Sequence, residues 1–262
     1  LTAKQAYSRY DVILPAFVEA VEGGNKKMEA NGWDRKIPVP NWRLTYTGLT
    51  NLPIINRYAD QVEIAHAYQS SYTVTGAQTN LNYGSTLVGV GNTESKYIFG
   101  SVAMVEAFNP LVGVDVTLRN NLQFSAQYIR DRMLQLNFDS YTLSEDYGNE
   151  IIAGFGYIFK ELKFKMRYQG RQKTITGDLN VRGDFSIRDN ESRLRKFGIF
   201  DEFGNLVEDN QIIGGQKMVK FMFSADYNLS QNLNIKFYWD QNLSKYKLST
   251  AYPISTIRTG IS

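Results

Sequence analysis

The stretch from Val219 to Leu243 contains two runs of strict alternation that are separated by a short polar turn. The apolar positions are Val219, Phe221, Phe223, Ala225, Tyr227 and Leu229 in the first run, and Leu233, Ile235, Phe237 and Trp239 in the second. A repeat of two residues places alternate side chains on opposite faces of a β-strand, so this stretch predicts a β-hairpin. Each run exceeds the roughly five to six residues of a typical soluble strand and reaches the ~9–11 residues that cross a bilayer when tilted.

The composition is typical of a folded β protein whose apolar and polar residues are interleaved. Of the 262 residues, 43% are hydrophobic and 21% are charged, and there are 17 Tyr and 15 Phe. The mean hydropathy is -0.34, and no run of ~18 apolar residues predicts a transmembrane helix. Strands of a membrane barrel carry apolar residues at only every second position, so this composition agrees with a membrane barrel.

Several functional classes are disfavoured by the residues themselves. There is no cysteine, which excludes a disulfide scaffold and a thiolate metal site. The formal charge of +3 is spread along the chain, so we predict no nucleic-acid partner. The only histidine, His66, lies within an alternating run and is assigned a structural role. Without a Gly-x-Ser-x-Gly motif or a phosphate-binding loop, the sequence predicts no enzyme, no cofactor and no metal.

Two segments differ in pattern. Residues 1–41 predict a loop region with one short helix over residues 15–22, bounded by Pro15 and by Gly23 and Gly24. Residues 42–262 predict about twelve long antiparallel strands in a single unit, with long loops on one side and short turns on the other. The segment around Pro110 fits either one long strand or two short ones. The predicted fold class is therefore all-β, as an antiparallel transmembrane β-barrel segment that is part of a much larger barrel.

The loops and turns of this predicted segment fix its orientation. Loops are predicted at residues 144–149 and 189–215, and tight turns at Arg119, Lys160-Glu161 and Ser230. If the C-terminus lies on the periplasmic side, counting strands backwards places the loops after Phe138, Ile199 and Leu243 outside the cell and the turns inside. Arg130 and Arg132 interrupt an apolar face and are expected at or beyond the membrane edge, because a lipid-facing Arg near the midplane costs ~2–4 kcal/mol.

Alternation assigns candidate residues to two faces. The residues proposed to face the lumen are Asp178, Asn180, Arg182, Asp184, Ser186, Arg188, Ser224, Asp226 and Lys236. The residues proposed to face lipid or a partner are Val181, Phe185, Ile187, Phe221, Phe223, Ile235 and Phe237. Aromatic residues expected near strand ends, as in an interfacial girdle, are Tyr157, Phe159, Tyr227, Trp239 and Tyr252. Exposed aromatic residues also fit a carbohydrate-binding β-sandwich, although these strands are longer than a sandwich requires.

Several stretches point to a particular family. They are Ile37-Pro-Val-Pro-Asn-Trp-Arg-Leu-Thr-Tyr-Thr-Gly-Leu49, Asn109-Pro-Leu-Val-Gly-Val-Asp-Val-Thr-Leu-Arg-Asn-Asn121, Asp184-Phe-Ser-Ile-Arg-Asp-Asn190, Lys220 to Leu229 and Thr250-Ala-Tyr-Pro-Ile-Ser255. Together they resemble the C-terminal region of the SprA/Sov family, and the resemblance spans nearly all of the chain after its first few residues. None of these motifs is catalytic.

The resemblance implies a function in protein export. Members of that family are very large outer-membrane barrels that form the translocon of the type IX secretion system. By resemblance, the chain would lie in the bacterial cell outer membrane and export folded proteins, including adhesins for gliding motility. It looks like a C-terminal portion with about a third of the strands of a 36-strand barrel. Expected partners are the remaining strands, the secreted cargo, plug or shuttle proteins and the lipid bilayer. The alternatives are a TonB-dependent or fatty-acid-transporter-like barrel and, third, a soluble β-sandwich binding module.

Overall fold

The computed structural model describes residues 13, 14, 17, 40–83, 96–168, 171–200, 206–230, 233–248 and 252–261, and most of this part is antiparallel β-sheet. Nine strands form one sheet, in which every hydrogen-bonded pair is antiparallel. In spatial order they are β1 (Trp42–Tyr46), β2 (Ala59–Thr75), β5 (Ser101–Leu118), β6 (Leu122–Asn137), β7 (Thr142–Tyr168), β8 (Arg171–Phe200), β9 (Leu206–Ser230), β10 (Leu233–Tyr246) and β11 (Ile254–Ile261). The all-β class predicted from the alternation is thus confirmed.

The remaining described elements are small. Strands β3 (Gln78–Thr79) and β4 (Tyr97–Ile98) form a separate two-stranded sheet. A 3₁₀ turn, η1 (Gly48–Asn51), and a four-residue helix, α2 (Pro53–Asn56), connect β1 to β2, with Pro53 at the start of the helix, where its missing N–H leaves no bond unmade. No helix of the described residues is long and apolar enough to cross a membrane. The eleven described strands compare with the prediction of about twelve.

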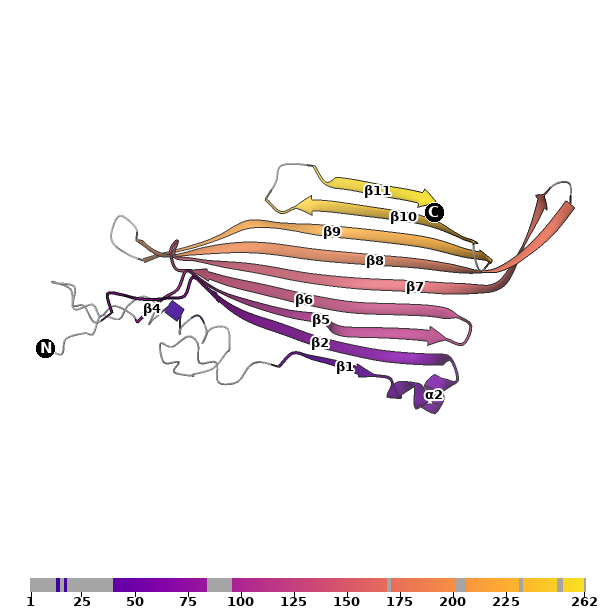
Figure 1. Cartoon of the computed structure of the whole chain (residues 1–262), viewed down its shortest axis with the longest axis horizontal. Coiled ribbons are helices and arrows are strands. Elements are labelled where there is room, and N and C mark those ends of the chain that lie inside the picture. Colours follow the sequence, from indigo (N-terminus) through magenta and orange to yellow (C-terminus); the bar gives the residue numbers. More distant parts are fainter. Residues whose placement is uncertain are drawn as a thin grey trace.

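The sheet has two distinct ends. At one end, here called the turn end, lie α2 and the tight turn at residues 119–121. At the other, the loop end, lie β3, β4 and the turn at residues 138–141. Both β1 and β11 run toward the turn end, as their arrowheads show in Figure 1. Each of them pairs on one side only among the described residues, so the sheet is open.

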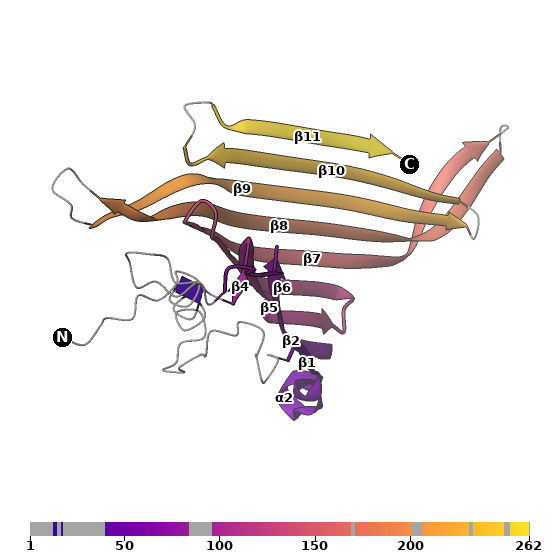
Figure 2. The ribbon, with the colours of Figure 1, turned by 60° about the vertical axis from the view of Figure 1, so that its left-hand side comes forward.

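The sheet is a single curved layer (Figures 1 and 2), and its main apolar core lies near the loop end. This covered cluster consists of Leu14, Phe17, Phe99, Val102, Met104, Leu134, Leu136 and Phe138. Val102 pairs directly with Leu136, and Met104 pairs with Leu134, across β5 and β6. The helical residues Leu14 and Phe17 pack on this patch, which is how an isolated short helix gains stability. The other positions of the helix predicted over residues 15–22 lie outside the described residues.

The two predicted loops with dense charge are wrong. Residues 144–149 belong to β7, where each of them pairs with both β6 and β8. Residues 189–200 belong to β8 and residues 206–215 belong to β9. The physical reason is that these strand portions carry polar groups on both faces, and several of these groups find partners on the neighbouring strand. Glu145, for example, pairs with Arg195 of β8 on one face, while Asp146 accepts from Ser192 of β8 on the other.

The turn predicted at Lys160-Glu161 is also wrong. β7 continues to Tyr168, and the pairing with β8 shifts register between Phe159 and Leu162. Glu161 has a positive φ of 53°, and its N–H donates to Asp178 Oδ1 at 2.9 Å, so the extra residue forms a β-bulge. Beyond this bulge the β7–β8 hairpin bends away from the sheet (Figure 1). Pro110 lies inside the single long strand β5, where the register shifts between Phe108 and Val112.

Candidate functional site

The strand register sorts the sequence-predicted residues onto two faces. Val181 pairs with Ala225, Phe185 with Phe221 and Ile187 with Val219, so these side chains share one face. The residues on this apolar face include all seven that were proposed to face lipid: Val181, Phe185, Ile187, Phe221, Phe223, Ile235 and Phe237. Trp239, which was expected near a strand end, pairs with Phe223 and lies in the middle of β10.

The apolar face has a continuous central band. It covers the alternate residues of Ile151–Phe159 on β7, Leu179–Ile187 on β8, Val219–Tyr227 on β9 and Ile235–Leu243 on β10, which the register aligns. No apolar-face position in these four ranges is Asp, Glu, Lys or Arg. Nine residues span about 27 Å along a strand, or about 20 Å across a bilayer at a tilt of ~40°. This height is close to the ~25 Å apolar band of outer-membrane barrels.

The aromatic rings of the band are half-exposed and pack mainly on their neighbours in the sheet. Phe155 lies over Gly183 of the adjacent strand, where a Cβ atom would collide with the ring. Tyr157 and Phe159 meet edge-to-face at 4.5 Å, as do Phe221 and Trp239 at 5.3 Å. Such aromatic contacts, within β7 in the first case and between β9 and β10 in the second, contribute a few tenths to about 1 kcal/mol each and do not cover the band.

The opposite, polar face carries the residues proposed for the lumen. Arg182 pairs with Ser224, Asn180 with Asp226 and Asp226 with Lys236 along neighbouring strands. All nine proposed residues lie on this face: Asp178, Asn180, Arg182, Asp184, Ser186, Arg188, Ser224, Asp226 and Lys236. Lys236 Nζ lies 3.8 Å from Asp226 Oδ1, whereas Asp178 is engaged by the bulge and Ser186 is buried.

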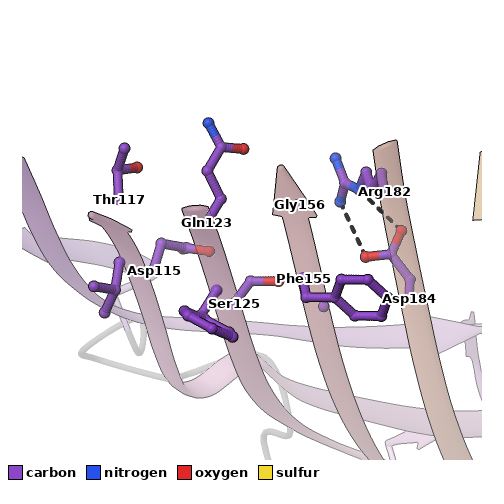
Figure 3. Close-up of a pocket in the computed structure, with 11 residues that line it drawn as sticks. Asp115, Thr117, Gln123, Ser125, Phe155, Gly156, Arg182 and Asp184 are labelled. Carbon is purple, nitrogen blue, oxygen red and sulfur yellow. Dashed lines mark hydrogen bonds and ion pairs between the residues drawn. The ribbon is translucent and has the colours of Figure 1, made fainter. Parts of the chain in front are cut away.

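A shallow pocket of about 210 Å³ lies on the polar face near the turn end. The Arg182 guanidinium donates to both carboxylate oxygens of Asp184, at 2.9 and 3.2 Å, as the dashed lines in Figure 3 show. Ser125 of β6 and Asp184 of β8 approach each other across Gly154 of β7. Gly154 has no side chain to fill the space between them. Sequence reasoning missed Asp115, Gln123 and Ser125, although their polar positions in alternating strands would have identified them.

An ion-pair network on the polar face joins three strands toward the loop end. Arg188 of β8 lies 2.8 Å from Asp131 Oδ1 on β6 and 3.2 Å from Glu150 Oε2 on β7. Gly148 makes room for it, since a Cβ there would meet both Asp131 and Arg188. Arg188 was proposed from sequence, whereas its two acidic partners were not. The network holds charged groups in register on a face that water can reach.

A charged layer lies on the apolar face just beyond the band. It consists of Arg130, Arg132, Glu145, Tyr147, Asn149, Asp189, Glu191, Arg193 and Lys247. Lys247 Nζ lies 2.7 Å from Asp189 Oδ1 and 3.0 Å from Glu191 Oε2, and Arg193 Nε lies 2.5 Å from Glu191 Oε1. Hydrogen bonds from Lys247 and then Arg193 lower the pKa of the Glu191 carboxyl. Burial, and next the hydrogen bond to Glu145, raises the pKa of Tyr147.

Arg130 and Arg132, which the sequence analysis expected at or beyond the membrane edge, both belong to the charged layer. Arg130 pairs with Asn149 and Arg132 pairs with Tyr147, directly between the band and the covered cluster. A further group at this level is aromatic: Trp42 stacks on Tyr68 at 4.6 Å, and Tyr68 contacts Phe108 at 4.9 Å. At this level of the sheet, the apolar residues of the apolar face give way to other side chains. These are charged on β6 to β10 and aromatic on β1, β2 and β5.

Catalytic and metal-binding arrangements were also sought on the sheet. His66 Nδ1 lies 2.6 Å from the Leu111 carbonyl oxygen, and its ring contacts Trp42 and Phe108. Within the described ranges, no three His, Cys, Asp or Glu side chains gather as they would around a metal ion. The described strands thus present two surfaces: one is apolar and bounded by charge, and the other is polar.

No protein-family model matches the chain, and a search of curated proteins found no match.

Proposed function

We propose that this chain forms part of the wall of the outer-membrane, protein-conducting channel of the type IX secretion system, which exports folded proteins including gliding adhesins. The proposal rests on the contrast between the two faces of one open sheet. An uncharged band runs across four aligned strands on the apolar face, and charged and polar residues occupy the opposite positions. We assign the apolar face to the lipid bilayer and the polar face to a water-filled lumen.

The dimensions of the band support the lipid assignment. Its height of about 20 Å agrees with the hydrocarbon layer of an outer membrane, and it ends in a charged row. A contiguous apolar surface of this extent, with no covering element among the described residues, is unusual on a soluble protein. A soluble β-sandwich would cover the same face with a second sheet. The single layer therefore disfavours the sandwich alternative.

The strand directions support a wall that is completed by other strands. β1 and β11 both run toward the turn end, so direct closure of the nine strands would require a parallel pair (Figure 1). Bacterial single-chain barrels have even numbers of antiparallel strands, and an open edge in hydrocarbon leaves several kcal/mol of hydrogen bonding unmet per group. We infer that further strands of the same barrel pair with β1 and β11, which makes the pore wider than nine strands.

The polar face suits the lumen of a wide pore. A wide barrel holds water, so its inner wall tolerates ionised groups such as the Arg188 network. The identity of the secretion system, its cargo and its plug or shuttle partners rests on the sequence resemblance to the SprA/Sov family. The rival, a small-molecule transporter, shares both faces and differs in closing its own barrel. We assign no enzymatic activity, cofactor or nucleic-acid partner to the chain.

Thiol labelling tests the assignment of the faces. The chain has no cysteine, so the single variants Phe223→Cys and Ser224→Cys need no altered background. In lipid vesicles, a membrane-impermeant thiol reagent should label Ser224→Cys and leave Phe223→Cys unlabelled, and both should be labelled after unfolding. Equal labelling of the folded variants would sink the proposal.

Cross-linking separates the secretion channel from the small transporter. Thr45 of β1 and Thr256 of β11 lie on the polar face of the two edge strands. Cysteines at both positions should stay unlinked within one chain if other strands lie between β1 and β11. Efficient intramolecular cross-linking would show that the barrel closes on itself and would favour the transporter.

A further inference from the structure

The charged layer encloses a pocket on the apolar face. The pocket has a volume of about 360 Å³ and is lined by Arg130, Asp131, Tyr147, Asn149, Asp189, Glu191, Arg193 and Lys247. Its floor is the row that follows the last apolar positions of the band: Asn149 follows Ile151, and Arg130 follows Tyr128. The pocket is therefore one step of the strand alternation, about 7 Å along the chain, beyond the edge of the band.

This position matches the depth of lipid phosphates. The apolar band of an outer-membrane barrel is ~25 Å tall, and the polar headgroup layer that follows it on each side is roughly 5–8 Å deep. If the band contacts hydrocarbon, the pocket opens into the headgroup layer at the loop end. This step rests on the proposed function, because it uses the lipid assignment of the apolar face.

Among the described residues, the charges leave one unpaired cation in the pocket lining, Arg130, and a second beside the pocket, Arg132, which contacts the lining residue Tyr147. The acids are already satisfied: Asp131 pairs with Arg188, Lys247 bridges Asp189 and Glu191, and Arg193 also pairs with Glu191. Arg130 is exposed and makes no ion pair or hydrogen bond through its side chain within the described part of the chain. The Arg132 guanidinium lies over the Tyr147 ring, at 5.6 Å from its centroid, and its Nε is buried without a hydrogen-bond partner there.

We propose that this pocket binds the phosphate group of a lipid in the leaflet at the loop end. Arg130 and Arg132 supply the guanidinium donors, which suit the bidentate recognition of phosphate oxygens. Tyr147 holds Arg132 in place through its ring, and the acyl chains lie along the apolar band below. The lipid thereby bridges the band and the charged layer at a fixed point of the barrel wall.

Native mass spectrometry of the full chain in detergent micelles tests the proposal. The probes are phosphatidylglycerol, an uncharged diacylglycerol and inorganic phosphate. We expect phosphatidylglycerol to bind in preference to diacylglycerol, and the double variant Arg130→Gln/Arg132→Gln to weaken its binding about tenfold or more, because two charge-assisted contacts are lost. The matched control, Lys220→Gln/Lys236→Gln, removes the same charge from the polar face and should bind as the unmodified chain does.

Other outcomes decide against the site. Equal binding by the two double variants, or equal binding of diacylglycerol, would overturn it. Competition by inorganic phosphate at the same concentration would identify a free-phosphate site and overturn the lipid source. The variant Arg130→Lys/Arg132→Lys keeps the charge and should retain part of the affinity, which separates lost binding from lost folding. If these tests fail while Phe223→Cys and Ser224→Cys still differ in labelling, the site is wrong and the proposed function stands.

Discussion

Two apolar regions of the same sheet face have opposite surroundings. In the covered cluster near the loop end, Leu134 and Leu136 are 3% and 2% exposed, because Leu14, Phe17 and other side chains pack on them. In the apolar band, Ile151 and Phe155 are 60% and 47% exposed. Both regions alternate in the same way and both lie on β6 and its neighbours, with Arg130 and Arg132 between them.

The difference shows that an apolar pattern does not indicate what covers the apolar face. Alternation reports which face is apolar, and the same pattern serves a patch covered by protein and a patch covered by lipid. The boundary is more informative than the pattern, because on the proposed membrane assignment the charged side chains of the apolar face mark the level at which water returns. On that assignment the covered cluster lies on the water side of the boundary, where the chain's own helical residues close it, whereas none of the described residues covers the band.

The largest expected effect comes from truncating a side chain in the covered cluster. Leu136→Ala should lower the free energy of unfolding by ~2–5 kcal/mol. The variant loses the free energy of transferring the removed side-chain atoms out of water, and it leaves a cavity between packed neighbours. The matched variant Leu243→Ala, in the band, should lose only the transfer term of up to ~2 kcal/mol, since fluid acyl chains close the gap. Urea unfolding of the chain in lipid vesicles measures both values. Equal costs would mean that packed protein, and not lipid, covers the band.

A charge placed in the band should have the next largest effect. Phe223→Arg should destabilise the folded chain in vesicles by ~2–4 kcal/mol, because the guanidinium would lie near the bilayer midplane. Ser224→Arg, one residue along the strand, should cost ~1 kcal/mol or less, as a surface substitution does. The same urea titration gives both values. A penalty at Ser224 as large as that at Phe223 would show that the two faces do not differ in solvent.

The sequence was a good guide to the faces and a poor guide to strand ends. Phe223 and Ser224 were assigned to opposite faces because a period of two needs only local alternation, and the register confirms that their neighbours share those faces. Residues 144–149 were predicted as a loop because both faces of β7 are polar there. A strand portion in water has no apolar face to signal it, and its partners, such as Arg195 near Glu145, are distant in sequence.

The same limit explains the bulge and the missed pocket residues. Lys160-Glu161 has the composition of a turn, and only the pairing with β8 shows that β7 continues past it. The charged layer was partly foreseen through Arg130 and Arg132. Its other members come from β7, from β8 and from the residue just after β10, and their ion pairs depend on register that the sequence alone does not give.

The smallest expected effect concerns pH and the charged layer. Lys247 and Arg193 hold the pKa of Glu191 below its usual range, and an unfolded Glu has a pKa of ~4.3. The carboxylate therefore favours the folded chain above that pH, and its contribution disappears as the pH falls through the lowered value of the folded chain. Because these side chains are partly exposed and screened by salt, the effect should be at most ~1 kcal/mol. Glu191→Gln should accordingly shift the urea midpoint slightly at pH 7 and by less as the pH is lowered below ~4.3, whereas Leu243→Ala should cost the same throughout. A Glu191→Gln effect that persists unchanged at pH 3 would show that packing, and not charge, holds this layer together.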